Sequence, residues 1–297
     1  MFKKFEEVAE IAKSKGRKRI AVVEGVSEEI VEGLKMAKEI VSPILIGDAE
    51  KIGKFVEAYK IEDVQIVDSK SPLDSAFKAC EMVRNGSADL IMKGKIDTPT
   101  FLRSLLDKEK GIRTDRVFSH IAILEVPNYH KMVFLTDSGM NIRPDLKMKI
   151  GILQNAIEVM KVLGYEEIKV AFLASLETLH EDMPETIEFA AMSKLQDRSF
   201  FKGVKVYLDG PLGFDLAVSK KAAELKGVTS PVCGDADLWF VADVATGNIL
   251  AKALIYLAKA KVGGMIYGAK VPVVLLSRAD APELKFYSIV SAVAACG

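Results

Sequence analysis

The chain has 297 residues, of which 49% are hydrophobic and 28% are charged, a composition typical of a globular protein with full hydrophobic cores. Its 41 Lys and Arg residues balance 41 Asp and Glu residues, so the formal net charge at pH 7 is zero. Proteins that bind nucleic acids or membrane surfaces normally carry a basic excess, so the balance argues against both classes. A local basic pocket remains compatible with it.

The sequence contains no apolar stretch long enough to span a bilayer. Its first segment, MFKKFEEVAEIAKSKGRKRI, has the pattern of an amphipathic helix and not that of a signal peptide. Cys80, Cys233 and Cys296 are scattered and show no metal-ligand spacing. We therefore expect a cytoplasmic protein with reduced thiols and no bound metal.

Short apolar runs rich in Val and Ile alternate with helical patterns along the chain. An amphipathic N-terminal helix is followed by the expected strands RIAVVEG, SPILIGD, DVQIVD and ADLIMKG, with helices at SEEIVEGLKMAKEI and near residues 49–59 and 72–85. Two strands, FSHIAILEV and KMVFLTD, are then separated by PNYH, which predicts a hairpin turn. The remaining expected elements are the helix LKMKIGILQNAIEVMKVLG, the strand IKVAFLAS, the helix PETIEFAAMSKLQ, the strand VKVYLDG, a helix near 215–226, the strand DLWFVA, a helix at 246–260, the strands GGMIYG and VPVVLLS, and a final amphipathic stretch.

Alternating strands and helices, with strands that are apolar throughout, predict an α/β fold with parallel sheets covered by helices. The hairpin interrupts this alternation, so we place a domain boundary shortly after it, near residues 136–144. We expect a first α/β domain over residues 1–140, with the C-terminal segment 272–297 as a candidate addition to it, and a second over residues 141–271. In such sheets ligands bind outside the carboxyl ends of the strands.

Polar loops follow several expected strands. A glycine-containing loop that opens a helix presents backbone N–H groups to an anion, so two such loops are candidates for binding phosphate. Plainer interpretations remain open, because Lys-Gly-Lys is often a solvated turn and SGMN can be a helix cap. The candidate side chains and backbones in these loops are Lys93, Lys95 and Thr98 in MKGKIDTPT, and Ser138, Gly139 and Asn141 in TDSGMNIRPD.

The stretch VPVVLLSRAD ends an apolar run with Ser277, Arg278 and Asp280. An arginine placed after six apolar residues needs a charged partner. That partner is either an anionic ligand or Asp280 itself, and both interpretations stay open at this point.

Further acidic and amide residues lie in DGPLGFD and in GDADLWFVADVATGN, where many are also residues that turns prefer. Carboxylates do not suit phosphate binding, so we expect them to orient cationic groups or to cap helices. They are Asp209, Asp235, Asp237 and Asp243, together with Asn248.

Several familiar signatures are missing from the sequence: a complete phosphate-binding P-loop, a G-x-G-x-x-G after the first strand, and a G-x-S-x-G elbow. The histidines, His120, His130 and His180, have no metal-binding spacing, and we expect a core or surface role for each.

Stretches that match one known family run in order along nearly the whole chain: LIMKGKIDT, RTDRVFSHIAILE, TDSGMNIRPDLKMKIGILQNAIEV, DMPET, DGPLGFDLAVS, SPVCGDADLWFVADVATGN, and LLSRAD followed by Lys285 and Ser288. Together they resemble the phosphate acetyl/butyryl transferase family, and most of all its phosphate butyryltransferase branch. The resemblance implies two α/β domains of the isocitrate/isopropylmalate dehydrogenase-like fold, an active site in the interdomain cleft, and a homo-oligomer.

Members of this family transfer the acyl group of an acyl-CoA to inorganic phosphate, giving an acyl phosphate and free CoA. The resemblance implies acyl-CoA and phosphate as substrates, with butyryl or a similar short acyl group as in short-chain fatty acid metabolism, and no further cofactor. It also implies catalytic roles for Ser277 and Arg278, with Asp280 beside them. Lys93, Lys95 and either Arg113 or Arg143 are candidates to bind the phosphate groups of CoA.

The sequence departs from the family pattern at the general base. Related enzymes have an aspartate several residues after the Ser-Arg pair, whereas this chain reads ADAPELK and has no aspartate at the matching place. The nearest carboxylates are Asp280 and Glu283, so the assignment of the base does not transfer.

We expect direct attack of phosphate on the thioester in a ternary complex, because no serine or cysteine shows a histidine partner in the sequence. Two alternatives are a metal- or NAD-dependent dehydrogenase of the same fold and a CoA-binding homologue that has lost catalysis. The first would need metal-binding residues and a place for nicotinamide, and the missing aspartate keeps the second open.

Overall fold

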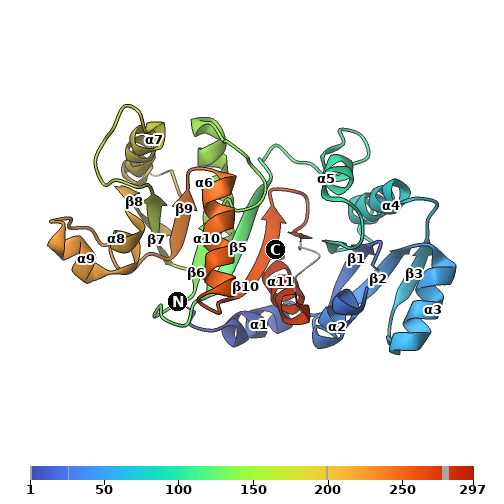
Figure 1. Ribbon diagram of the computed structural model, residues 1–297. Coiled ribbons are helices and arrows are strands. Elements are labelled where there is room, and N and C mark those ends of the chain that lie inside the picture. The colour runs from blue at the N-terminus through green and yellow to red at the C-terminus, as the bar shows by residue number, and fades with distance from the viewer. Residues whose placement is uncertain (1, 26, 199, 276–280) are drawn as a thin grey trace. The chain divides into compact units, whose positions relative to one another are not determined.

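The computed structural model describes residues 2–25, 27–198, 200–275 and 281–297 (Figure 1). The chain forms two compact units: unit 1 comprises residues 1–4 and 119–261, and unit 2 comprises residues 5–118 and 262–297. Each unit has its own part of the β-structure and its own helices.

In unit 2 the strands are arranged in the order β3-β2-β1-β4-β11-β10. Pairing is parallel from β3 to β11, and β11 pairs antiparallel with β10. The central strands are continuously apolar, so both of their faces are buried, as expected for a parallel sheet. The strands are β1 (Lys18–Val23), β2 (Val41–Gly47), β3 (Gln65–Asp68), β4 (Leu90–Lys93), β10 (Lys261–Tyr267) and β11 (Val273–Val274).

The helices of unit 2 pack on this sheet and on each other. Helix α4 contacts β1, β2 and β4, whereas α11 contacts β11, α1 and α2. Short polar side chains begin several of them: Ser27, Asp48 and Ser71 each accept a hydrogen bond from a backbone N–H of the first turn. These helices are α1 (Phe5–Ser14), α2 (Glu28–Met36), α3 (Ala49–Tyr59), α4 (Pro72–Arg84), α5 (Thr98–Leu106) and α11 (Pro282–Ala294).

In unit 1 the strands are arranged in the order β5-β6-β9-β7-β8. Strands β5 and β6 form an antiparallel hairpin, and the pairs from β6 to β8 are parallel. The hairpin expected around PNYH is therefore confirmed. The strands are β5 (Ser119–Glu125), β6 (Val133–Thr136), β7 (Glu167–Leu173), β8 (Lys205–Leu212) and β9 (Leu238–Val241).

Helix α10 contacts β6 and β9, while α6 contacts β5 and β6 (Figure 1). Phe172, Phe189 and Phe240 are fully buried and contact each other edge-to-face or stacked, which joins α7 to the sheet. The helices of unit 1 are α6 (Leu146–Val162), α7 (Pro184–Ser193), the 3-10 helix η1 (Lys194–Arg198), α8 (Phe214–Val218), α9 (Lys220–Leu225) and α10 (Val244–Tyr256).

The α/β fold with mainly parallel strands is thus confirmed. The single helix expected near 215–226 consists of two helices, α8 and α9, which meet at Ser219. The strand expected over 271–276 extends only over Val273–Val274 within the described residues, and it is antiparallel to β10.

The two compact units do not divide where the domains were expected, near residue 140. Strands β5 and β6 pair with each other and β6 pairs with β9, so the whole hairpin lies in the sheet of unit 1 and the division comes at residue 119. The C-terminal residues 262–297 do cluster with the N-terminal part of the chain. The domain boundaries themselves stay a prediction.

A group of charged side chains lies at the amino ends of β6, β7 and β9, with Lys131 and Asp237 buried at its centre. The Lys131 ammonium lies 2.8 Å from a carboxylate oxygen of Asp235 and 2.7 Å from one of Asp237. Lys169 and His130 also bind Asp235, at 2.5 and 2.8 Å. Burial alone would raise the pKa of Asp235, but these hydrogen bonds outweigh it and hold the pKa well below its ordinary value. For Asp237 burial dominates and raises the pKa, despite the attraction of Lys131.

Candidate functional site

The Lys93–Lys95 loop at the carboxyl end of β4 is held against the end of β1. Gly94 N–H donates to the Val23 carbonyl and Lys95 N–H to that of Glu24, both at 2.8 Å. A Cβ at Gly94 would lie 2.3 Å from the Val23 carbonyl oxygen, so only glycine fits there. The Lys93 side chain is buried and that of Lys95 is exposed. The loop is therefore an ordered part of the sheet edge and not a solvated turn.

Helix α5 follows directly, and its first turn is capped by a carboxylate. Asp97 accepts a hydrogen bond from Thr100 N–H at 2.9 Å, and this bond is the main cause that lowers the pKa of Asp97, with Lys93 adding attraction. Thr98 is the exposed first residue of the helix. Because Asp97 already serves the first turn, the anion-binding capacity of this edge comes mainly from the lysines.

A third lysine lies near the same edge. The pKa of Glu29, at the start of α2, is lowered first by hydrogen bonds from its own N–H and from Ser27, and then by attraction to Lys285 and Lys95. Lys285 is buried on α11, where its Cβ would be 2.9 Å from a Cβ placed at Gly33. Lys285 therefore adds positive charge near Glu29, as Lys95 does from the carboxyl edge of unit 2.

We expect Gly94→Ala to lower the free energy of unfolding by about 1–3 kcal/mol, the usual cost of inserting a methyl group into a packed site. The change should also lower catalytic activity, because the Lys93–Lys95 loop must move away from β1. Urea unfolding measures the loss of stability, and an enzyme assay under steady-state conditions measures the loss of activity. Gly53→Ala is the control: nothing lies within 4 Å of a Cβ there in the middle of α3, so alanine should stabilise by about 0.5–1 kcal/mol. Equal stabilities of the two variants would contradict the expected clash.

In unit 1 the loop after β6 is organised by the buried carboxylate of Asp137. One of its oxygens accepts hydrogen bonds from Gly139 N–H and Met140 N–H at 2.9 Å, and the other accepts from the Asn141 amide at 2.6 Å. Residues 137–141 therefore form a loop closed by its own side chain. We call it the Asp137 loop.

Within this loop Ser138 is almost fully buried, and its hydroxyl lies 2.8 Å from Nδ1 of His120. His120 comes from β5 and is half-buried. Its backbone carbonyl accepts a hydrogen bond from the Thr136 hydroxyl at 2.8 Å, and a Cβ at Gly139 would lie 3.1 Å from the imidazole Cγ. The ring therefore contacts the Asp137 loop, while the His120 backbone is bound by Thr136 of the neighbouring strand.

The first turn of α10 packs on the other side of the Asp137 loop. A Cβ at Gly247 would lie 2.7 Å from the Asp137 carbonyl oxygen and 2.9 Å from Ser138 Cα, and the Asn248 amide donates to the Ser138 carbonyl at 3.4 Å. Asp243 caps α10 by accepting from Thr246 N–H at 2.8 Å. The loop is therefore fixed from β5 and from α10.

The structure brings the expected site residues together in two groups, one in each unit. Lys93, Lys95 and Thr98 share the edge of unit 2, whereas Ser138, Gly139 and Asn141 share the Asp137 loop of unit 1. Ser277, Arg278 and Asp280 lie outside the described residues. The interpretation of SGMN as a helix cap is wrong, because Asp145 caps α6 by accepting from Met148 N–H.

The structure gives roles of the expected kinds to Asp235, Asp237 and Asp243. Asp243 caps a helix, while Asp235 and Asp237 bind lysines at the amino ends of strands, away from the Asp137 loop. His120, for which a core or surface role was expected, is half-buried and pairs with Ser138, and its role stays a prediction. The register of the hairpin could have revealed this pair: because Ala122 faces Leu135, His120 faces Asp137, the neighbour of Ser138.

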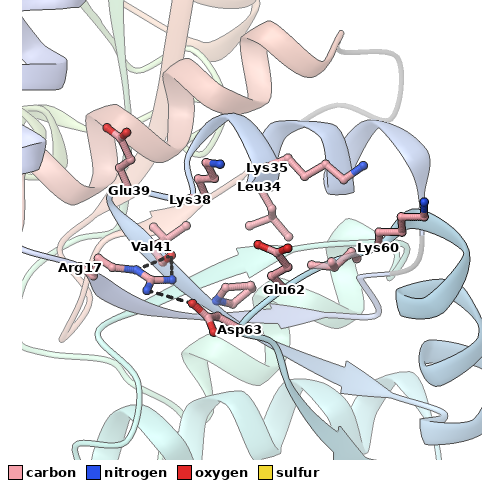
Figure 2. Close-up of a pocket in the computed structure, with 11 residues that line it drawn as sticks. Arg17, Leu34, Lys35, Lys38, Glu39, Val41, Lys60, Glu62 and Asp63 are labelled. Atoms are coloured by element: carbon pink, nitrogen blue, oxygen red, sulfur yellow. Dashed lines mark hydrogen bonds and ion pairs between the residues drawn. The ribbon is translucent and has the colours of Figure 1, made fainter.

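A pocket of about 550 Å³ in unit 2 lies at the amino ends of β1 and β2, the opposite edge from Lys93 (Figure 2). Figure 2 shows the Arg17 guanidinium directed at the Val41 carbonyl and at Asp63, with contacts of 3.2 to 3.4 Å. The pocket is lined by both basic and acidic side chains: Arg17, Lys35, Lys38 and Lys60, and Glu39, Glu62 and Asp63. Ligands in such folds bind at the carboxyl ends of the strands, and the acidic side chains here would repel phosphate. This pocket is therefore a poor candidate for a phosphate site.

A second pocket, of about 640 Å³, lies in unit 1 at the carboxyl ends of β7 and β9. Leu173, Phe214 and Leu250 supply apolar walls, and its charged lining residues are the carboxylates Glu185 and Asp243. Carboxylates repel phosphate, so this pocket does not suit an anion either.

Within the described ranges no three His, Cys, Asp or Glu side chains are grouped closely enough to hold a metal ion. In the same part of the chain no helix is both long and apolar enough to cross a membrane.

A family model and individual relatives both match this chain over most of its length. The family described as "Phosphate acetyl/butaryl transferase" matches residues 65–294. A phosphate butyryltransferase of Clostridium acetobutylicum is 40% identical, covering 100% of this chain and 99% of the relative. A phosphate acetyltransferase of Thermotoga maritima is 39% identical, covering 96% of this chain and 97% of the relative.

Among solved structures, a branched-chain phosphotransacylase from Enterococcus faecalis superposes with a TM-score of 0.81 at 32% identity, covering 94% of this chain and 99% of that one. A 4-hydroxythreonine-4-phosphate dehydrogenase from Klebsiella pneumoniae reaches a TM-score of 0.55 at 14% identity, covering 94% of this chain and 99% of that one, which is a likeness of fold alone.

Proposed function

The chain belongs to the phosphate acetyl/butyryl transferase family, and on that basis we propose that it transfers a short acyl group between CoA and inorganic phosphate. The reaction is acyl-CoA + phosphate = acyl phosphate + CoA. The observation that carries the proposal is the identity of 40% over the whole chain with a phosphate butyryltransferase, which brings the family's motif regions with it. We propose butyryl or a similar short chain as the acyl group.

The lysines at the carboxyl edge of unit 2 support the proposal, because both substrates are anions. Phosphate and the pyrophosphate and 3′-phosphate of CoA need cationic partners. We propose that Lys93 and Lys95 bind these groups, with Thr98 beside them. Lys285 adds positive charge near the same edge.

In unit 1 we propose that Ser138, Gly139 and Asn141 contact a substrate through the Asp137 loop. Its shape is fixed by Asp137, so these groups are held in place before a ligand arrives. From the family resemblance we propose Ser277 and Arg278 as catalytic residues, with Asp280 beside them.

We propose that phosphate attacks the thioester carbon directly in a ternary complex. Phosphate near neutral pH is a mixture of monoanion and dianion, and the dianion is itself a competent nucleophile. Positioning the reactants contributes about 7–11 kcal/mol and one oxyanion donor about 3–4 kcal/mol, whereas a general base adds about 10²–10⁴-fold. The guanidinium of Arg278 can hold two phosphate oxygens and neutralise the developing charge.

The hydrogen bond between His120 and Ser138 removes one premise of that mechanism, because a serine with a histidine partner is present after all. Rapid-quench labelling with radioactive butyryl-CoA, without phosphate, tests for a covalent route. We expect no acyl-protein. A stoichiometric adduct would replace direct attack by a two-step mechanism.

The function is tested by phosphate-dependent thiol release from acyl-CoA substrates of two to six carbons. We expect release only when phosphate is present, with the highest kcat/KM for a short chain. Release of thiol without phosphate would indicate a thioesterase. Stabilisation by CoA without thiol release would indicate a homologue that binds CoA but has lost catalysis.

The dehydrogenase alternative is not favoured, because its likeness is confined to the fold at 14% identity. Incubation with NAD and a 2-hydroxy acid, followed by absorbance of the reduced nicotinamide, would detect such an activity. We expect none.

We propose that the protein is a homo-oligomer and that a second copy covers the outer face of α10. Ile249 and Tyr256 of α10 and Leu257, its C-cap residue, have 69%, 60% and 84% of their surface exposed, and the helical spacing places them on one side as an apolar stripe. The chain has a net charge of zero, so two copies do not repel each other.

We expect Leu257→Glu to shift the mass measured by light scattering from that of an oligomer toward 32.5 kDa, the mass of one chain. Leu225→Glu on α9 is the matched control, because Leu225 is similarly exposed but lies on another helix. An unchanged mass for Leu257→Glu would exclude this helix as the contact.

A further inference from the structure

We propose that His120 and Ser138 form a proton relay that moves the phosphate proton to the departing sulfur of CoA. The inference rests on the proposed function and names the group that would do the work of the missing aspartate. Ser138 would contact the reacting atoms. His120 acts through Ser138 and is therefore a positioning residue that also stores the proton.

The reaction requires such a transfer. As an oxygen of HPO₄²⁻ bonds to the thioester carbon, the C–S bond breaks and its electron pair leaves with the sulfur. The phosphate must lose a proton and the thiolate must gain one. In the relay the Ser138 hydroxyl passes its proton to Nδ1 of His120 while taking the phosphate proton, and the reverse transfer then gives a proton to the sulfur. Serine and histidine end unchanged, so atoms and charges balance.

The geometry of the pair fits this role. Ser138 Oγ and His120 Nδ1 are 2.8 Å apart, within the range for proton transfer along a hydrogen bond. In the tautomer that carries its proton on Nε2, Nδ1 accepts from the serine hydroxyl. Ser138 is almost fully buried, so its hydroxyl direction is set by this bond and not by bulk water. Both residues lie at the carboxyl edge of the unit 1 sheet, where ligands bind in such folds.

The neighbouring carboxylate is less suited to the task. Asp137 accepts three hydrogen bonds from its own loop, two from backbone N–H groups and one from Asn141. Protonating it would break the bonds that shape the loop. His120 can gain and lose a proton while its backbone stays fixed by Thr136.

The relay is tested with His120→Asn, Ser138→Ala and the double variant in the thiol-release assay. Asparagine keeps a hydrogen-bonding atom near the position of Nδ1 but cannot store a proton. We expect each single variant to lower kcat by about 10²–10³-fold, with KM for phosphate and for butyryl-CoA changed less than about threefold. The double variant should be no slower than the slower single variant, because the pair acts as a unit.

Imidazole rescue separates proton storage from structural support. In His120→Ala, added imidazole should raise kcat at least about tenfold, and it should have no effect on His120→Ala/Ser138→Ala. His130→Asn is the control: this histidine also binds a partner side chain in unit 1 but lies at the other sheet edge, and its kcat should not change.

The outcomes are separable. If the wild-type protein releases no thiol in the presence of phosphate, the proposed function fails and the relay with it. If the wild type turns over normally and His120→Asn retains kcat within threefold, only the relay is overturned. Multiplicative losses in the double variant, absence of imidazole rescue, or an acylated Ser138 would each overturn it as well. Thermal unfolding of every variant checks that it is folded, and should His120→Ala fail to fold, the kcat of His120→Asn and Ser138→Ala decides.

Discussion

Replacing Lys131 with methionine should lower the free energy of unfolding by about 3–5 kcal/mol, because it leaves a buried carboxylate without its cation. Only 1% of the Lys131 side chain and 1% of the Asp237 side chain are exposed, and their charged atoms are 2.7 Å apart. Urea unfolding followed by circular dichroism measures the loss. The double variant Lys131→Met/Asp237→Asn should recover part of it, since asparagine removes the charge but still accepts from Lys169 N–H.

A control variant sharpens this result. Lys169→Met removes a partner of Asp235 that is more exposed, so we expect a smaller loss. A loss in Lys131→Met no greater than that in Lys169→Met would mean that the buried pair contributes little.

The same cluster predicts a dependence on pH. The pKa of Asp235 is lowered in the folded protein, so its contribution to stability is present above the unfolded pKa of about 4 and is lost as pH falls through the folded value. In Lys131→Met the pKa of Asp237, already raised by burial, should rise further. A carboxyl group whose pKa is raised in the folded state contributes to the stability of that state at low pH, and this contribution is lost as pH rises. The free energy of unfolding of Lys131→Met should therefore fall further below that of the native chain from pH 5 to pH 8.

Replacing Arg278 with alanine should lower kcat by more than about a hundredfold, the size of effect expected for a donor that stabilises charge in the transition state. The reason is chemical: a guanidinium can bind two phosphate oxygens at once, and no neighbouring group of the sequence SRAD can replace it. Steady-state thiol release with butyryl-CoA and phosphate measures the effect.

Arg278→Lys tests the geometry of that contact, since lysine keeps the charge but not the paired donors, and we expect an intermediate loss. Arg198→Ala in η1 is the control, because Arg198 is an exposed residue of unit 1 that belongs to neither group of expected site residues. A near-normal rate in Arg278→Ala would remove this residue from the proposed mechanism.

Much of the fold could be predicted because the strands that matter are continuous apolar runs. The apolar runs Ile20–Val23 and Val170–Leu173 lie in β1 and β7, and PNYH lies in the turn of the hairpin. Helix caps were predicted only in part: Asp243 caps α10, as expected of the acidic residues, but the cap of α6 is Asp145 and not the SGMN segment. The shortness of the strand Val273–Val274 could not be predicted, because a run of apolar residues does not show how many of them pair with a neighbouring strand.

The contact between His120 and Ser138 in unit 1 could not be predicted from the sequence, because it depends on how two strands pair. His120 and Ser138 are 18 residues apart and meet because β5 and β6 pair in one particular register. No spacing rule for catalytic pairs covers such a case. The acidic group at Asp235 and Asp237 was ambiguous for a similar reason: only the tertiary structure shows that Lys131 and Lys169 converge on it.

The closed shape of the Asp137 loop has a consequence for ligand association. Segments that order only when a ligand arrives lose conformational entropy at each binding event, which weakens affinity and gives a large unfavourable entropy of binding. Here the three hydrogen bonds to Asp137 fix the backbone during folding, once and for all. Calorimetry of CoA binding should therefore show a larger entropic penalty in Asp137→Ala than in the native chain, even where the affinity of the two differs little.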